Sequence, residues 1–382
     1  MVLKSQKPKL LIISDTIRSD LHSPLRYFRK FAVTHAYRQA SYADMTKSDW
    51  AATAAFQFGS PLQLVKLVTS LKPDIVQLPE PTAGRRAALT TALLLPVVAA
   101  VGAKVLVPFF ENVPIREKFQ GITLQLVVSI TKRLIKQAHM LIYLNRGARD
   151  NLVFLGAPEA KLNRLFWGSW GVAEYFRPSE KLPARNATQS VAGGKNKSLP
   201  AQTGEKLKIV LYVGVVSYRK GIGYLVEAME QVIKKVPNAK LWLVGPNGDF
   251  APPQKSWIKR FGPRKNRDLP RIFQQATVSV LPSITTPQWQ EQVGMVNLQS
   301  LACGTPVVTT SSGAIAEFVK DGEGALLVRQ KDAGALARGI LEVLSLAPGK
   351  RAELSRKGKE WVLKRYQISS NIQKIERLLT RL

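Results

Sequence analysis

A short loop rich in glycine and cations follows an apolar run in the second half of the chain. Residues 211–221 read LYVGVVSYRKG. Glycine lets a backbone approach a ligand closely, and adjacent cations beside a helix start form an anion site, for which phosphate is the natural ligand. The pattern predicts that Gly214, Ser217, Arg219 and Lys220 bind a phosphate group. A solvated Arg-Lys pair on an ordinary strand–helix turn is the alternative.

A second group of polar residues precedes a helix start. Residues 281–306 read LPSITTPQWQEQVGMVNLQSLACGTP, in which Glu291 lies on a loop and Gln299 follows it by eight positions on the expected helix. Free amide groups at a helix start, backed by the helix dipole, stabilise anions. The amide groups that would do so here are those of Gly294, Met295 and Val296. Glu291 could instead be a simple helix cap.

Several motif-based enzyme classes lack support in the sequence. There is no GxxxxGK[ST] loop, complete GxGxxG, HExxH, paired CxxC or Asp-x-Asp, and the chain has one cysteine and three histidines. This argues against P-loop kinases, classical dehydrogenases, zinc hydrolases and metal-dependent sugar transferases. We expect no metal site and no resident cofactor.

Alternating strands and helices must position these loops. Most candidate strands are continuous apolar runs, which are typical of parallel strands covered on both faces, so the predicted fold class is α/β. These strands are residues 10–14, 75–78, 104–110, 140–144, 209–213, 240–244, 278–281, 306–309 and 325–328. Residues 179–206 have almost no large apolar side chains and predict a linker. The expected division is 1–178, a linker at 179–206, a second domain at 207–350 and C-terminal helices at 351–382.

The motifs together resemble the family-4 glycosyltransferases of the GT-B fold. The resemblance covers most of residues 138–328, and its motifs occur in the family's order. The matching segments are Gly156-Ala-Pro158, Gly171-Val-x3-Phe176-x-Pro178, Val213-Gly-x5-Lys220-Gly221, Gly245-Pro-Asn-Gly248, Leu269-Pro-x3-Gln-Gln-Ala276, Leu281-Pro-Ser283, Glu291-x-Val-Gly294 with Gln299, Ala302-Cys-Gly-Thr-Pro306, Gly313-x3-Glu317 and Asp321-Gly322. The resemblance implies two Rossmann-like domains facing a cleft, with a C-terminal helix crossing back to the first domain.

The same resemblance implies a function and roles for individual residues. A UDP- or GDP-linked sugar would bind the second domain, the first domain would bind a glycan or lipid-linked acceptor, and transfer would proceed without metal and with retention. Lys220 would neutralise the diphosphate and Glu291 would contact the donor sugar. Gln299 stands where the family has a ribose-binding glutamate. In the first domain, Glu111 and Asn112 fall where the family places a polar catalytic residue.

Some features leave alternatives open. Gln299, Val215 after the loop glycine, and residues 15–22 in place of a glycine-rich acceptor loop depart from the family pattern, so an inactive GT-B scaffold is one alternative. The net charge is +30 and favours an anionic partner. A nucleic-acid-binding protein is therefore a second alternative, although no nucleic-acid motif supports it.

The positive charge also bears on the acceptor and on localisation. Residues 116–137 place Phe119, Ile122, Leu126, Ile130 and Leu134 at helical spacing, flanked by basic residues. The stripe predicts either a helix packed on the core or one lying on an anionic membrane. The Arg85-Arg86 pair could line the acceptor site. With no signal peptide or membrane span evident, we expect a cytoplasmic protein and leave a peripheral contact with the inner face of the membrane open.

Overall fold

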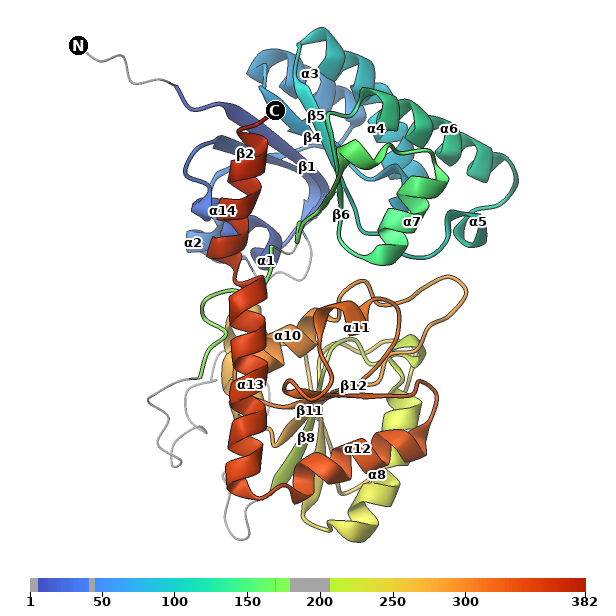
Figure 1. Cartoon of the computed structure of the whole chain (residues 1–382), viewed down its shortest axis with the longest axis vertical. Coiled ribbons are helices and arrows are strands. Elements are labelled where there is room, and N and C mark those ends of the chain that lie inside the picture. The colour runs from blue at the N-terminus through green and yellow to red at the C-terminus, as the bar shows by residue number, and fades with distance from the viewer. Residues whose placement is uncertain (1–5, 41–44, 169, 179–206) are drawn as a thin grey trace, which may run out of the picture. The chain divides into compact units, whose positions relative to one another are not determined.

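The computed structural model describes residues 6–40, 45–168, 170–178 and 207–382, in two compact units (Figure 1). The N-terminal unit comprises Met1–Ala173 and Tyr366–Leu382, and the C-terminal unit comprises Glu174–Arg365. The predicted linker at 179–206 lies outside the described residues.

The N-terminal unit is built on a seven-stranded, fully parallel sheet in the order β3-β2-β1-β4-β5-β6-β7. Its strands are β1 (Lys9–Ile17), β2 (Ala32–Ala40), β3 (Ala54–Gln57), β4 (Ile75–Gln77), β5 (Lys104–Phe109), β6 (Met140–Tyr143) and β7 (Leu162–Arg164). Its helices are α1 (Ser19–His22), α2 (Lys47–Trp50), α3 (Pro61–Leu71), α4 (Arg85–Ala100), α5 (Ile115–Lys118), α6 (Gly121–Gln137), α7 (Arg146–Phe154) and α14 (Ile368–Leu379).

Alternating side chains of the strands build a core on each face of this sheet. Leu11 and Ile13 of β1 belong to the core beneath α3, α4, α6 and α7, whereas Leu10 and Ile12 belong to the core on the face that α14 covers (Figure 1). On that second face, the carboxylate of Glu376 accepts hydrogen bonds from the amides of Arg29 and Lys30 at 2.7 and 2.6 Å. The chain therefore returns to its first unit through α14, as predicted.

The C-terminal unit repeats this plan with a six-stranded parallel sheet in the order β10-β9-β8-β11-β12-β13. Its strands are β8 (Lys208–Val213), β9 (Ala239–Val244), β10 (Ile258–Phe261), β11 (Val278–Leu281), β12 (Val307–Thr310) and β13 (Ala325–Val328). Its helices are α8 (Ile222–Lys235), α9 (Leu269–Gln275), α10 (Met295–Ala302), α11 (Ile315–Phe318), α12 (Ala333–Ser345) and α13 (Pro348–Tyr366).

One expectation about the helices was wrong in part. The stripe predicted over residues 116–137 is not the buried face of α6, because Ile122 is 83% exposed and Leu126 is 38% exposed. The helix instead buries Val127, Thr131, Leu134 and Ile135. The later positions of the stripe are spaced by four residues within α6, and each such step moves about 40° around a helix of 3.6 residues per turn. Ile122 therefore lies about 120° around the helix from the buried Leu134 and faces solvent.

Candidate functional site

The order of strands reverses once in the C-terminal unit, between β8 and its neighbour β11. From β8 the chain proceeds to β9 and β10 on one side of the sheet and then returns to β11 on the other. Loops leaving the carboxyl ends of such a strand pair diverge and leave room for a ligand. Both loops singled out from the sequence begin at these two strand ends.

The two loops contact each other directly. The amide of Ile284, after β11, donates to the carbonyl of Arg219, after β8, at 3.0 Å. Gly221 has φ 70°, and a Cβ there would lie 1.9 Å from the carbonyl oxygen of Pro282. Glycine is therefore required at this position by both its backbone conformation and its surroundings.

Lys220 and Glu291, predicted from separate motifs, form an ion pair in this structure. The hydroxyl of Ser283 donates to the same carboxylate oxygen at 2.6 Å. The side chains of Lys220 and Glu291 are 17% and 9% exposed. The structure thus brings together a cation for a phosphate and a carboxylate for sugar hydroxyls, but each neutralises the other.

Trp289 is a member of this site that the sequence reasoning did not single out. The guanidinium of Arg219 lies 4.2 Å from the centre of its indole ring, and the ammonium of Lys220 lies 4.8 Å from it. An aromatic face holds such cations in place. The available signal was an aromatic residue two positions before Glu291, on the loop expected to approach the Arg-Lys pair.

Ser217 has an unsatisfied hydroxyl in the same loop. The residue is 4% exposed, and its Oγ has no hydrogen-bond partner among the residues described. A buried polar atom without a partner is costly, and a ligand oxygen would satisfy it.

Gly214 lies at the start of the loop with φ 150°, and its carbonyl oxygen lies only 2.0 Å from the position that a Cβ on Gly245 would occupy.

Helix α10 begins near the carboxyl end of β11. A Cβ on Gly294 would lie 3.2 Å from the side chain of Leu281, the last residue of β11. Within the described part of the chain, the amides of Met295 and Val296 have no hydrogen-bond acceptor. Gln299 is half-buried one turn further along α10.

The N-terminal unit has a pocket at its own strand reversal, between β1 and β4. Its volume is about 450 Å³, and it is lined by residues of β1 and β2, by the loops after β4 and before α3, and by the start of α4. Asp15 and Arg38 form a two-point ion pair in this pocket, with N–O distances of 2.6 and 3.0 Å. Arg86, one of the two arginines noted in the sequence, also lines it, whereas Arg85 does not.

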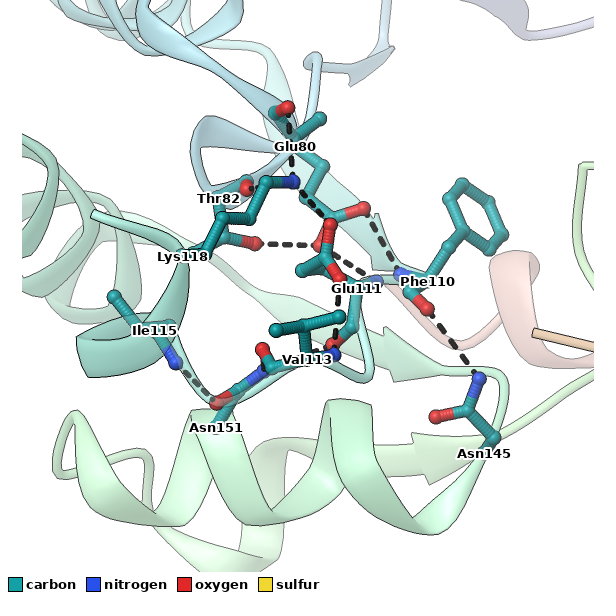
Figure 2. Close-up of polar contacts among 10 residues, drawn as sticks. Glu80, Thr82, Phe110, Glu111, Val113, Ile115, Lys118, Asn145 and Asn151 are labelled. Atoms are coloured by element: carbon teal, nitrogen blue, oxygen red, sulfur yellow. Dashed lines mark hydrogen bonds and ion pairs between the residues drawn. The ribbon is translucent and has the colours of Figure 1, made fainter. Parts of the chain in front are cut away.

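Glu111 and Asn112 lie in the loop after β5, and Figure 2 shows the polar network around Glu111. The carboxylate of Glu111 pairs with Lys118 and accepts a hydrogen bond from the amide of Val113 at 2.9 Å. Asn151 donates to the carbonyls of Glu111 and Val113 at 2.9 and 3.0 Å. These contacts fix the conformation of the loop. They do not test the catalytic role of Glu111 and Asn112, which stays a prediction.

Glu80, on the loop after β4, organises this network. Its carboxylate accepts hydrogen bonds from the amides of Phe110 and Glu111 at 2.9 and 3.0 Å and from the hydroxyl of Thr82 (Figure 2). Burial raises the pKa of Glu80 to about 7 despite these hydrogen bonds.

Cysteine and metal chemistry were not expected from the sequence. Burial raises the pKa of the Cys303 thiol to about 12, as suits a packing residue. In the described residues, no three His, Cys, Asp or Glu side chains are grouped so as to hold a metal ion. Over the same residues, every helix is too short or too polar to cross a membrane.

The segment that contains these loops matches a known protein family. Residues 196–361 match the family model described as glycosyl transferases group 1. The match covers less than half of the chain, and within it the resemblance drawn from the motifs is confirmed.

Individual relatives match different lengths of the chain. An uncharacterized glycosyltransferase of Methanocaldococcus jannaschii is 34% identical over 158 residues, which are 39% of this chain and 38% of that relative. The GDP-mannose-dependent alpha-(1-6)-phosphatidylinositol monomannoside mannosyltransferase of Mycolicibacterium smegmatis is 23% identical over 81% of this chain and 82% of its own length.

Solved structures share the fold over the whole chain. The crystal structure of Anabaena HepE in complex with UDP and glucose has a TM-score of 0.71 at 16% identity and covers 98% of this chain and 100% of that one. WaaG, a glycosyltransferase involved in lipopolysaccharide biosynthesis, has a TM-score of 0.67 at 15% identity, with 97% and 99% covered. The predicted fold class, two Rossmann-like α/β domains of the GT-B type, is confirmed.

Proposed function

We propose that this chain transfers a sugar from a nucleoside-diphosphate donor to a glycan or lipid-linked acceptor, with retention of configuration. The observation that carries the proposal is the Lys220–Glu291 pair at the strand reversal of a group 1 glycosyltransferase domain. The complexes of HepE with UDP and UDP-glucose, and the GDP-mannose dependence of the mycobacterial relative, support a nucleotide sugar without choosing UDP or GDP.

The ion pair suggests how the donor would bind. An incoming diphosphate would take Lys220 away from Glu291, and the freed carboxylate would then accept hydrogen bonds from sugar hydroxyls. Arg219, the unsatisfied hydroxyl of Ser217 and the amides of Met295 and Val296 would add contacts to phosphate oxygens. Gln299 would reach the ribose by neutral hydrogen bonds, which are weaker than those of a carboxylate.

The same groups would assist bond breaking. Negative charge develops on the departing diphosphate as the glycosidic bond loosens, and fixed cations and helix amides stabilise it without reorganising. Lys220 and the start of α10 would supply this stabilisation, so we propose transfer without a metal ion. Turnover that persists in EDTA would support this part, and turnover that EDTA abolishes would contradict it.

Release of nucleoside diphosphate from a panel of UDP- and GDP-sugars tests the function. We expect Lys220→Ala and Glu291→Ala each to lower turnover by about 100-fold or more. Lys255→Ala is the matched control, because Lys255 forms an exposed ion pair with Glu230 in the same unit. Unchanged turnover in both site variants would refute the site. Nucleotide binding without turnover would favour an inactive scaffold. Salt-sensitive oligonucleotide binding without any response to UDP or GDP would favour a nucleic-acid-binding protein.

We also propose that the N-terminal unit contacts the anionic inner face of the membrane from the cytoplasm. Leu89 and Leu93 are exposed one turn apart on α4, and Ile122 and Leu126 are exposed one turn apart on the adjacent α6. Basic residues lie near both ends of α6, so the face suits an anionic lipid surface.

Sedimentation with phosphatidylglycerol-containing vesicles tests this contact. An Ile122→Glu, Leu126→Glu double variant should lose most of the binding, whereas Val153→Glu, at an exposed apolar position on α7, should not. Binding that is equal in all three proteins would contradict the proposal.

A further inference from the structure

Two of the three histidines of the chain are buried together in the N-terminal unit. His22, the last residue of α1, is 0% exposed and His35 of β2 is 2% exposed, and their Nδ1 atoms lie 3.0 Å apart. Nε2 of His35 lies 2.8 Å from the hydroxyl oxygen of Ser14 on β1, and Ser14 lines the pocket of this unit. A chain of hydrogen bonds therefore runs from the pocket wall through both imidazole rings.

The direction of this chain follows from the number of hydrogens available. The hydroxyl of Ser14 donates its one hydrogen to the carbonyl of Thr16 at 2.8 Å, so His35 must donate from Nε2 to Ser14. Neutral His35 then accepts at Nδ1, and the Nδ1–H group of His22 is the donor between the rings. A lone pair is left on Nε2 of neutral His22. This atom is buried and has no hydrogen bond of normal geometry among the described residues.

A proton on Nε2 of His22 fits this arrangement without breaking any bond of the chain. A counter-charge is at hand in Asp49 of α2, whose side chain is fully buried and whose contact with the partly exposed Arg26 is 3.5 Å long. Burial, the largest effect, and Arg26 lower the pKa of His22, while the backbone of Trp50 and the charge of Asp49 favour its charged form. Burial and the charge of His22 lower the pKa of His35 to about 3, so His22 takes the first proton.

The surroundings leave Asp49 and Arg26 as the charges that act on the pair. Aromatic rings border both histidines, since the ring centre of Trp50 lies 6.1 Å from that of His22 and the ring centre of Tyr37 lies 6.4 Å from that of His35. The other charged side chains nearby, on β1, β2, α1 and α2 and in the loop before α1, are Asp15 and Arg38, which pair at 2.6 Å, Arg18 and Asp20, which pair at 3.1 Å, the exposed Lys47, and Lys9 at the far end of β1.

We infer that this chain is a proton switch, in which a proton bound at Nε2 of His22 sets the direction of the hydrogen bonds as far as Ser14. While His22 carries the proton, both rings must donate toward Ser14, and one lone pair of its Oγ is occupied. Without the proton, each histidine can take its other tautomer, and Ser14 then donates to His35 and presents both lone pairs of Oγ. The pocket wall therefore accepts hydrogen bonds more readily at neutral pH than in acid. The inference does not depend on the proposed function.

Nitrogen NMR of the histidine rings in the whole chain tests the switch without any substitution. As the pH is lowered from 7.5 to 5, His22 should become doubly protonated before His35, and His35 should then be fixed with its hydrogen on Nε2. His139 is the internal reference, because its Nδ1 accepts from the amide of Val105 at 3.1 Å and takes no part in the chain. A charged His35 beside a neutral His22, a His35 that keeps its hydrogen on Nδ1 once His22 is charged, or no proton uptake by either ring while the protein stays folded would overturn the inference.

Ser14→Ala tests whether the two ends of the chain are coupled. The variant removes the acceptor that the forward direction needs, so the midpoint of His22 protonation should move to a lower pH, although Ser14 and His22 are joined only through His35. Thr90→Val is the matched control, because Thr90 lines the same pocket and its loss should leave the midpoint unchanged. An equal midpoint in Ser14→Ala and wild type would show two uncoupled histidines and would overturn the switch.

Asp49→Asn tests the position of the proton. Loss of the counter-charge should move the midpoint of His22 protonation to a pH at least about one unit lower. Asp20→Asn is the control, since Asp20 lies on the same helix as His22 and pairs with Arg18 instead. Thermal melting confirms that both variants are folded at the temperature of the spectra. The same midpoint in folded Asp49→Asn and Asp20→Asn would overturn the assignment of the proton to Nε2 of His22.

Discussion

The two units of this chain share an architecture but differ where their strand order reverses. In the C-terminal unit, the loops after β8 and β11 touch, and Lys220 and Glu291 neutralise each other. In the N-terminal unit, the corresponding strand ends border a pocket of about 450 Å³ in which Arg86 is unpaired. The first site must exchange internal partners for its ligand, whereas the second already offers an uncompensated charge.

The largest expected effect concerns this exchange of partners. Lys220→Ala should weaken UDP or GDP binding at least tenfold, whereas Glu291→Gln should bind the nucleotide as tightly as the wild type or more tightly, because Lys220 is then released. Both variants should lose about 100-fold or more in turnover. Calorimetry with the nucleotide and a turnover assay measure the two effects. Weaker nucleotide binding in Glu291→Gln would show that the ion pair does not compete with the donor.

The glycines at the two strand ends should respond differently to one added methyl group. Gly221→Ala places a Cβ 1.9 Å from a backbone oxygen at φ 70°, and should destabilise the C-terminal unit by at least about 2 kcal/mol. Gly84→Ala meets no atom within 4 Å and has extended backbone, so it should change little. Hydrogen exchange of α8 and α4, with thermal melting, compares the two. If both variants destabilised their units to a similar extent, the loop at Gly84 would be as tightly packed as the loop at Gly221, and the contrast between the two units would be wrong.

A buried carboxyl near the open pocket should make the N-terminal unit sensitive to pH. Because the pKa of Glu80 rises to about 7 on folding, its contribution is most favourable below its unfolded pKa and is lost as pH rises toward 7. Relative to Glu80→Gln, the wild type should therefore lose about 3 kcal/mol between pH 4.5 and pH 8. Denaturant unfolding of both proteins at the two pH values measures this difference. A stability difference that stays constant with pH would show that folding does not raise the pKa of Glu80.

The interior strands of the fold were readable from the sequence because burial on both faces makes them apolar. All nine predicted strands are present. Those missed are β2, β3, β7 and β10, of which β3, β7 and β10 lie at sheet edges and carry polar residues such as Gln57, Asn163 and Lys259. Strand β2 includes His35 and Arg38, whose polar partners Ser14 and Asp15 lie on β1. A local pattern of apolar and polar residues does not reveal these partners.

The site of the C-terminal unit could be predicted from the sequence more fully than the pocket of the N-terminal unit. Lys220, Glu291 and the start of α10 follow the ends of two strands within short motifs, so the sequence predicted that they meet. The pocket of the N-terminal unit draws Asp15, Arg38, Phe58 and Arg86 from four separate segments. No spacing relates these four residues, and only the sheet order brings them together. The sequence indicated Arg86 and noted Asp15 only as part of a segment that departs from the family pattern.

The smallest expected effect is a difference in salt dependence between the two sites. Arg86 is exposed, so mobile ions screen its attraction to a phosphate, whereas the Lys220 side chain is only 17% exposed. Raising the salt from 50 to 300 mM sodium chloride should weaken binding of inorganic phosphate near Arg86 several-fold, and should weaken nucleotide binding less. Calorimetric titrations of the two ligands at both salt concentrations provide the comparison, with Arg86→Gln as the control that should flatten the first dependence. A steeper loss for the nucleotide would mean that Lys220 becomes accessible to solvent before the donor binds, and that the closed loop of the C-terminal unit opens readily.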